Sequence, residues 1–121
     1  MRFTGAMIGS EDPARLAEFY TAVLGEPGFR DGSWYGWSDK ADLMLGEHSD
    51  VKGKSANPQR IMLGVEADDV AASFQMLVAL GAEVIAEPYQ PEGAPGEVWL
   101  ATVTDPDGNY VQLMSPWEGP M

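Results

Sequence analysis

The spacing of apolar and polar positions predicts two helices. The first follows Ser10-Glu11-Asp12-Pro13, a typical helix start because a capping side chain precedes a proline at the first helical position. Gly25 is placed to end it. In the second half, Asp68-Asp69 precedes another stripe of helical period, which ends at Gly81. The apolar positions of the two stripes are Leu16, Phe19, Tyr20, Val23 and Leu24, and Val70, Phe74, Leu77 and Val78.

Short apolar runs around these helices predict β-strands, because they are rich in β-branched and aromatic residues. The last two runs form a hairpin around Asp105-Pro106-Asp107-Gly108-Asn109, where proline fixes φ and glycine accepts a left-handed conformation. The stretch 88–96, rich in proline and glycine, predicts a loop before this hairpin. Strands are expected near residues 2–9, 28–30, 34–38, 42–46, 61–65, 83–86, 98–103 and 110–114.

The second half of the chain repeats the first. Sliding one half onto the other places Leu63-Gly64 on Ile8-Gly9, and the predicted order of elements is βαβββ in both halves. Residues 48–58 are polar and have no apolar period, which indicates a linker. We therefore expect a single domain over residues 1–121, with module 1 at about 1–47, the linker at about 48–58 and module 2 at about 59–117.

The charge balance narrows the classes of partner. The chain has 19 acidic and 7 basic residues and a formal net charge of −12. Such a surface repels nucleic acid and anionic membranes and attracts cationic ligands. The chain has no cysteine, no apolar run long enough to span a membrane and no leader-like start. We expect a cytoplasmic protein with no nucleic-acid or membrane partner.

Two stretches carry a resemblance to a known family, Glu18-Phe19-Tyr20-Thr21-Ala22-Val23-Leu24-Gly25 and Asp105-Pro106-Asp107-Gly108-Asn109. Together with the repeat, they make the chain resemble the vicinal oxygen chelate superfamily of glyoxalase I, bleomycin-resistance proteins and extradiol dioxygenases. The resemblance implies an α+β fold in which the mixed sheets of two βαβββ modules curl round a shared cavity, with the helices outside. It also implies a homodimer, and Trp117 is expected to cover the barrel end or a dimer seam.

The metal site of this superfamily is expected to be lost. Metal-dependent relatives hold a divalent ion with His, Glu or Gln from the first and last strand of each module. The corresponding positions here are Gly5, Arg60, Met44 (or Asp42 if the register shifts) and Gln112. Glycine has no donor and arginine repels a cation, whereas such ions typically need at least three oxygen or imidazole donors from the protein. We therefore expect no metal and no other cofactor.

Other catalytic groups are also missing from the pattern. His48, the single histidine, stands beside Glu47 at the edge of the polar linker and is expected to be a solvated loop residue. Without cysteine or a serine–histidine pair at suggestive spacing, the sequence offers no activated nucleophile. We predict no catalytic residue.

Aromatic and thioether side chains are expected to line the implied cavity. Strand alternation puts Trp34 on one face and Tyr35 with Trp37 on the other, and leaves open which face meets a ligand. The side chains expected to face helices are Leu43, Leu45, Ile61, Leu63 and Val65. The expected ligand-binding residues are Trp34, Tyr35, Trp37, Asp42, Met44, Arg60, Met62, Trp99, Tyr110 and Gln112.

Three functions remain open at this point. The first is a non-catalytic binder of the bleomycin-resistance type, which confers drug resistance by sequestering a small, flat, cationic and aromatic molecule. The second is a lyase or isomerase on the same fold that uses Arg60 and Gln112 to polarise a carbonyl without a metal. The third is a dimeric interaction or regulatory module. Likeness of fold alone does not choose among them, and the sequence leaves open whether any reaction is catalysed.

Overall fold

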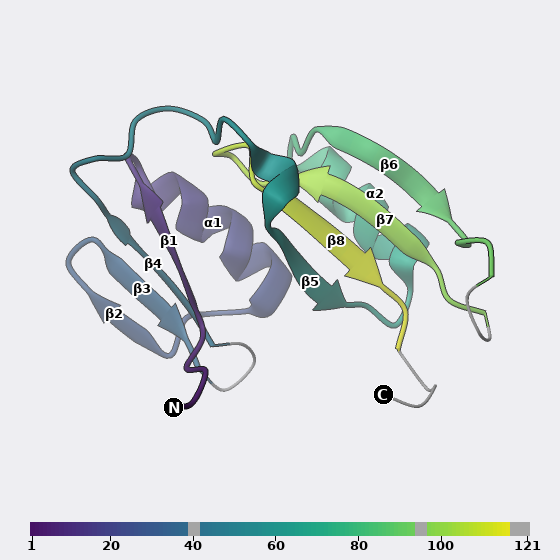
Figure 1. The fold of residues 1–121 in the computed structure, drawn as a ribbon, viewed down its shortest axis with the longest axis horizontal. Coiled ribbons are helices and arrows are strands. Elements are labelled where there is room, and N and C mark those ends of the chain that lie inside the picture. Colours follow the sequence, from purple (N-terminus) through teal and green to yellow (C-terminus); the bar gives the residue numbers. More distant parts are fainter. Residues whose placement is uncertain (39–41, 94–96, 117–121) are drawn as a thin grey trace. The chain divides into compact units, whose positions relative to one another are not determined.

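The computed structural model describes residues 1–38, 42–93 and 97–116. The chain forms two compact units, residues 1–54 and 55–121, and each is described by itself. The division falls inside the expected linker, and Trp117 lies outside the described residues. Each unit holds a helix and a four-stranded mixed sheet in the order βαβββ (Figure 1), so the predicted α+β fold class is confirmed.

Module 1 occupies the first unit. Its sheet has the strand order β1-β4-β3-β2, with β1 parallel to β4 and the other pairs antiparallel. The parallel pair is possible because α1 carries the chain from β1 across one face of the sheet. The elements are β1 (Ala6–Ser10), α1 (Pro13–Leu24), β2 (Phe29–Asp31), β3 (Trp34–Trp37) and β4 (Leu43–Glu47).

The ends of α1 follow the local signals in the sequence. The Asp12 carboxylate accepts a hydrogen bond from the N–H of Arg15 at 3.2 Å, and Pro13 takes the first helical position. At the other end Gly25 adopts φ 87° and donates its N–H to the carbonyl of Thr21 at 2.8 Å. The predicted start and end of this helix are confirmed.

The core of module 1 lies between α1 and its sheet. Tyr20 from the helix and Trp37 from β3 are each 1% exposed, and their ring centroids lie 6.4 Å apart. Leu43 and Leu45 are buried on the same side of the sheet, as predicted. Burial of a large apolar side chain contributes about 1.5–3 kcal/mol, so these residues supply much of the stability of the module.

Module 2 occupies the second unit and repeats this arrangement. The strand order is β5-β8-β7-β6, with β5 parallel to β8. Asp69 caps α2 by accepting the N–H of Ala72 at 3.0 Å, and Gly81 follows the helix with φ 97°. Among the described residues, no helix has the length and apolar content needed to cross a lipid bilayer. The elements are η1 (Pro58–Arg60), β5 (Met62–Glu66), α2 (Val70–Ala79), β6 (Val84–Tyr89), β7 (Leu100–Thr104) and β8 (Tyr110–Met114).

The turn between β7 and β8 is held by one buried carboxylate. Asp105 is 3% exposed and accepts hydrogen bonds from the backbone N–H groups of Asp107 at 2.9 Å and Asn109 at 3.0 Å, and from the Asn109 amide. Gly108 has φ 82°, the left-handed conformation that the sequence predicts for it. The predicted hairpin is confirmed.

Three local expectations are wrong. The loop predicted at 88–96 begins later, because β6 runs on to Tyr89 and includes Pro88. An edge strand tolerates the missing N–H of a proline, and the pairing of β6 with β7 shifts register here. The first strand begins at Ala6, since Gly5 before it has φ 135° and breaks the extended run. Ile61 is 77% exposed and does not pack under a helix, because it ends the 3-10 turn ahead of β5.

Candidate functional site

In each module the helix covers one face of the sheet, and we call the other face the open face. Strand pairing assigns residues to it, because paired residues point to the same side and neighbours in a strand alternate. The open face of module 1 carries Met7, Gly9, Phe29, Asp31, Trp34, Gly36, Met44 and Gly46. The open face of module 2 carries Met62, Gly64, Glu66, Leu100, Thr102, Thr104, Tyr110, Gln112 and Met114.

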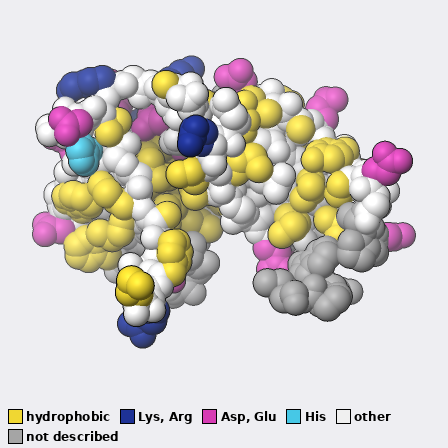
Figure 2. Space-filling model, viewed as in Figure 1, with side chains coloured by type: hydrophobic (Ala, Val, Ile, Leu, Met, Phe, Trp, Pro, Cys, Tyr) yellow, Lys and Arg dark blue, Asp and Glu magenta, His cyan; other side chains and the backbone are white. Residues whose placement is uncertain are grey.

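The open face of module 1 is an exposed apolar surface. Met7 and Met44 are partners across β1 and β4 and are 47% and 37% exposed. Trp34 and Phe29, from β3 and β2, are 36% and 49% exposed. Hydrophobic side chains gather over this sheet in the space-filling view (Figure 2). Apolar groups collected in this way on a sheet surface are typical of an interaction site.

Glycines lie beneath two of these side chains. A β-carbon at Gly46 would be no farther than 2.7 Å from Cε3, Cζ3 and Cδ2 of Trp34, so the indole occupies the space that this residue leaves. A β-carbon at Gly36 would lie 2.9 Å from Sδ of Met44. Real β-carbons do not approach other atoms so closely. The open face is therefore built from large apolar groups lying on bare backbone.

His48 lies at one corner of this face. Its Cβ and Cγ2 of Val51 would be 3.0 Å and 3.1 Å from a β-carbon at Gly9. The imidazole is exposed, as predicted, and its Nδ1 accepts the N–H of Asp50 at 3.2 Å. In the neutral ring the proton is therefore on Nε2. The sequence pattern gives no sign that this turn lies beside the apolar surface.

Tyr35 and Trp37 lie on the opposite side of the sheet from Trp34. They are 7% and 1% exposed, and Trp37 donates its indole N–H to the carbonyl of Gly25 at 2.8 Å. The Arg30 guanidinium stands over the ring of Tyr35, 5.1 Å from its centroid. The structure thus places these two expected ligand-binding residues in the core of module 1, not on its open face.

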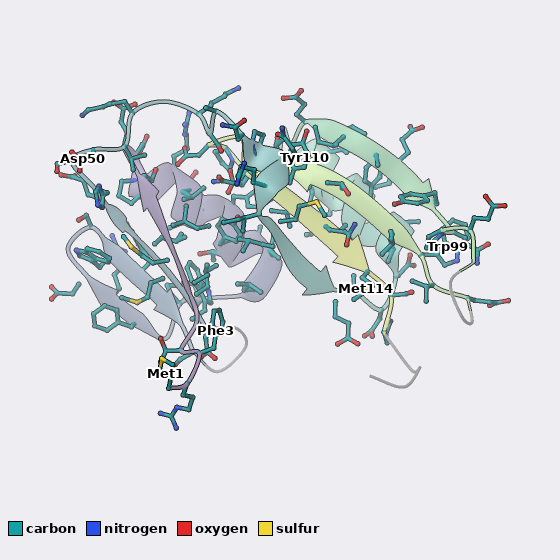
Figure 3. The ribbon with its side chains drawn as sticks, in the orientation of Figure 1. Met1, Phe3, Asp50, Trp99, Tyr110 and Met114 are labelled. Atoms are coloured by element: carbon teal, nitrogen blue, oxygen red, sulfur yellow. The ribbon has the colours of Figure 1, made fainter. Side chains whose placement is uncertain are left out.

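The open face of module 2 is more polar. Met62 pairs with Tyr110, and Gly64 pairs with Gln112, so the three expected ligand-binding residues Met62, Tyr110 and Gln112 lie together. Thr102 of β7 pairs with Gln112 and is buried. Tyr110 and Met114 mark the two ends of β8 (Figure 3).

Trp99 belongs to neither open face. Its backbone N–H meets Oγ of Ser115 at 2.9 Å, and its carbonyl accepts the Ser115 N–H at 3.0 Å, which extends the pairing of β7 with β8 by one residue. Alternation then puts its side chain on the side opposite Gln112, and it is 42% exposed just before β7 (Figure 3).

Asp42 lies immediately before β4, and Arg60 lies two residues before β5. Asp42 is exposed, and its carbonyl accepts the N–H of Ala6 at 2.9 Å, so its side chain continues the open-face column of Met44. Arg60 is exposed at the end of η1. The two residues belong to different units.

The residues at the metal-ligand positions of the superfamily do not fit a divalent ion. They comprise Gly5, which has no donor, the permanent cation Arg60, the thioether of Met44 (or the carboxylate of Asp42 if the register shifts) and a single amide in Gln112. Within 1–38, 42–93 and 97–116, no three His, Cys, Asp or Glu side chains form a group that could hold a metal. We therefore derive no chemical step through a metal.

The sequence pattern misses three side chains of the open face of module 1: Met7, Phe29 and Asp31. Met7 and Phe29 stand in predicted strands, but their face is set by partners far along the chain, Met44 for Met7 and Gly36 for Phe29. Strand alternation is the signal that could have found Met7. Met7 and Gly9 are two residues apart in β1, so they point to the same side of the sheet, which is the side that the helix leaves open.

Comparison with known proteins gives the family. The model of the glyoxalase-like domain matches residues 5–114, so this chain belongs to the glyoxalase-like domain family. The vicinal oxygen chelate superfamily inferred from the sequence is thereby confirmed. A search of curated proteins gives no match.

Solved structures agree on the fold. A glyoxalase/bleomycin resistance protein from Albidiferax ferrireducens T118 is 26% identical with a TM-score of 0.72, over 94% of this chain and 98% of that one. A glyoxalase-related enzyme from Fulvimarina pelagi is 19% identical with a TM-score of 0.74, over 95% and 88%. A glyoxalase/bleomycin resistance protein/dioxygenase family enzyme from Burkholderia phytofirmans PsJN is 19% identical with a TM-score of 0.73, over 93% and 96%.

Proposed function

We propose that this chain binds small planar hydrophobic molecules on the open face of module 1, cationic ones above all, and sequesters them without chemical change. Structures named as glyoxalase/bleomycin resistance proteins share its fold, which is consistent with a binding role. The ligand class rests on the residues of the open face, because one fold serves many functions.

The observation that carries the proposal is the position of Trp34. Its indole lies over Gly46, a buried residue, while 36% of the Trp34 surface is exposed. One side of the ring is therefore in contact with the sheet, and the other is available to a partner. Met44 and Phe29 lie on the same face, against Gly36 two residues along β3, and add polarizable and aromatic surface.

The charges at the edges of this face favour a cation. Asp31 is the strand partner of Trp34, and Asp42 precedes Met44 in the same column, and both are exposed. The basic residue of β2, Arg30, lies on the other face over Tyr35. A cationic ring system would meet an indole face with a carboxylate nearby, in a protein of net charge −12.

The expected affinity is moderate. Covering about 150 Å² of apolar surface stabilises a complex by about 4 kcal/mol at about 25 cal/mol per Å². A cation over an aromatic face adds about 0.5–2 kcal/mol, against which stand the entropic costs of association. The net affinity is therefore below this sum of about 4.5–6 kcal/mol, which by itself would correspond to a dissociation constant on the order of 0.1 mM.

Isothermal titration calorimetry with acridine orange, a planar cationic dye, tests the proposal. The protein, a Trp34→Ala variant and a Trp99→Ala variant are compared. Trp99 is the matched control, since it is 42% exposed but lies on neither open face. We expect Trp34→Ala to weaken binding about tenfold or more, equivalent to about 1.4 kcal/mol, and Trp99→Ala to leave it unchanged. Absence of binding to the unaltered protein, or equal losses in the two variants, would overturn the proposal.

A further inference from the structure

We infer that Gly46 is a positioning residue that makes this site selective for planar ligands. Because it has no side chain, the Trp34 indole lies face-down on the sheet, and the flat upper face of the ring then sets the shape of ligand that fits. This inference rests on the proposed function, and the experiments below separate failure of the one from failure of the other.

The orientation of the ring follows from three distances. The β-carbon position of Gly46 is close to Cδ2, Cε3 and Cζ3, three successive ring atoms, with Cδ2 the farthest at 2.7 Å. A point beyond the ring edge would be more than an ångström farther from Cδ2 than from the other two. The near equality therefore places Gly46 under the face of the six-membered ring, and not at its edge.

The contact between the face of the Trp34 ring and the Gly46 backbone, which we call the seat of Trp34, produces a flat recognition surface. With one face of the indole against backbone, the other faces away from the sheet, and Sδ of Met44 lies over Gly36, two residues along β3. A planar ring system contacts such a surface over its whole area, whereas a globular molecule touches it at a few atoms. Dispersion and apolar burial both grow with the area of contact, so the flat ligand binds more tightly.

A methyl group at Gly46 is expected to move the ring and leave the strand in place. Gly46 is not among the glycines with positive φ, so alanine fits its backbone conformation. The three nearest atoms to the added carbon all belong to Trp34. That side chain is partly exposed and has solvent to move into. Gly46→Ala therefore tilts the indole away from the sheet.

Gly64 supplies the control. It lies on the open face of module 2, next to Gln112, and a β-carbon there meets nothing within 4 Å. Gly64→Ala adds the same methyl group to the open face of the other sheet without moving an aromatic ring. We attribute a difference in ligand binding between Gly46→Ala and Gly64→Ala to displacement of the Trp34 ring.

The seat itself is tested without a ligand. In protein labelled with ¹³C-glycine, the ring current of an indole lying face-on shifts the α-protons of Gly46 upfield, and Trp34→Leu removes the shift. The α-protons of Gly64 should be unaffected by Trp34→Leu. If Trp34→Leu leaves the Gly46 resonances in place, the face-down seat is refuted, whatever the protein binds.

Selectivity is tested with acridine orange and 1-adamantylamine, two cations that differ in shape. The unaltered protein should prefer the planar dye by about tenfold or more, a difference of about 1.4 kcal/mol. Gly46→Ala should lose most of that preference and Gly64→Ala should keep it. In a Trp34→Leu background, Gly46→Ala should have no further effect, because the ring that it displaces is gone.

The outcomes separate the two claims. If the unaltered protein binds neither cation, both the proposed function and the claim of selectivity are refuted. If it binds acridine orange and Gly46→Ala keeps the full preference for the planar dye, the function stands and the role of Gly46 is refuted. If Gly46→Ala also weakens binding when Trp34 is Leu, the residue acts through the fold, and the inference is overturned.

Discussion

The indole N–H of Trp37 donates to the carbonyl oxygen of Gly25 at 2.8 Å, and this contact joins β3 to the end of α1. Trp37 is 1% exposed, whereas Trp34, three residues earlier, is 36% exposed on the other face. Two tryptophans of one short strand therefore serve opposite purposes. One is part of the core, and the other exposes its ring on the open face of module 1.

Substitution of these two tryptophans should have very different effects on stability. Trp37→Ala removes a buried indole and its hydrogen bond, which we expect to lower the free energy of unfolding by about 3–5 kcal/mol. Trp34→Ala should cost less, about 2 kcal/mol, because about a third of its surface is already in water. Urea unfolding followed by circular dichroism measures both. Similar losses for the two variants would show that our assignment of faces is wrong.

The turn of the last hairpin should depend on Asp105. Its carboxylate holds the backbone N–H groups of Asp107 and Asn109, and hydrogen bonds to a charged group contribute about 1.5–3 kcal/mol. Asp105→Ala leaves these two N–H groups without that acceptor and should lower the free energy of unfolding by about 2–4 kcal/mol. Glu92→Ala, at an exposed site, is the control and should change it by less than about 0.5 kcal/mol. A loss at Asp105 no larger than the control's would contradict the role of the carboxylate.

Much of the fold can be predicted because its signals are local. Residues next to each other in the sequence predict the helix start at Pro13 and the turn at Gly108, and the structure confirms both. Strand alternation also separates Trp34 from Trp37 correctly. These predictions need no knowledge of which segments meet in space.

The candidate site is less predictable because it depends on distant pairings. Which face of β3 is covered is decided by α1, and alternation alone does not give it. Met7 joins the open face through its pairing with Met44, and the Trp34 ring lies over Gly46 of β4. These contacts join residues that are far apart in the sequence, so no short motif predicts them.

Binding of a cationic ligand should weaken as salt is added. The net charge of −12 attracts the dye at long range, and salt shortens that reach to about 10 Å at 0.1 M. We expect the affinity for acridine orange to fall about threefold to tenfold between low and high salt. Binding of acridine, measured where that ring is uncharged, should change little. Equal salt dependence for the two would contradict electrostatic attraction of the cation.

The location of the ligand is the central claim, and methyl resonances of methionine test it most directly. The protein is labelled with ¹³C at its methionine methyl groups and titrated with acridine orange. Met7 and Met44 lie on the open face of module 1, Met62 lies on that of module 2, and Met76 is exposed on α2. We predict that the Met7 and Met44 signals shift with the same saturation and that Met76 stays in place. Shifts at Met76, or at Met62 without Met7 and Met44, would contradict the account.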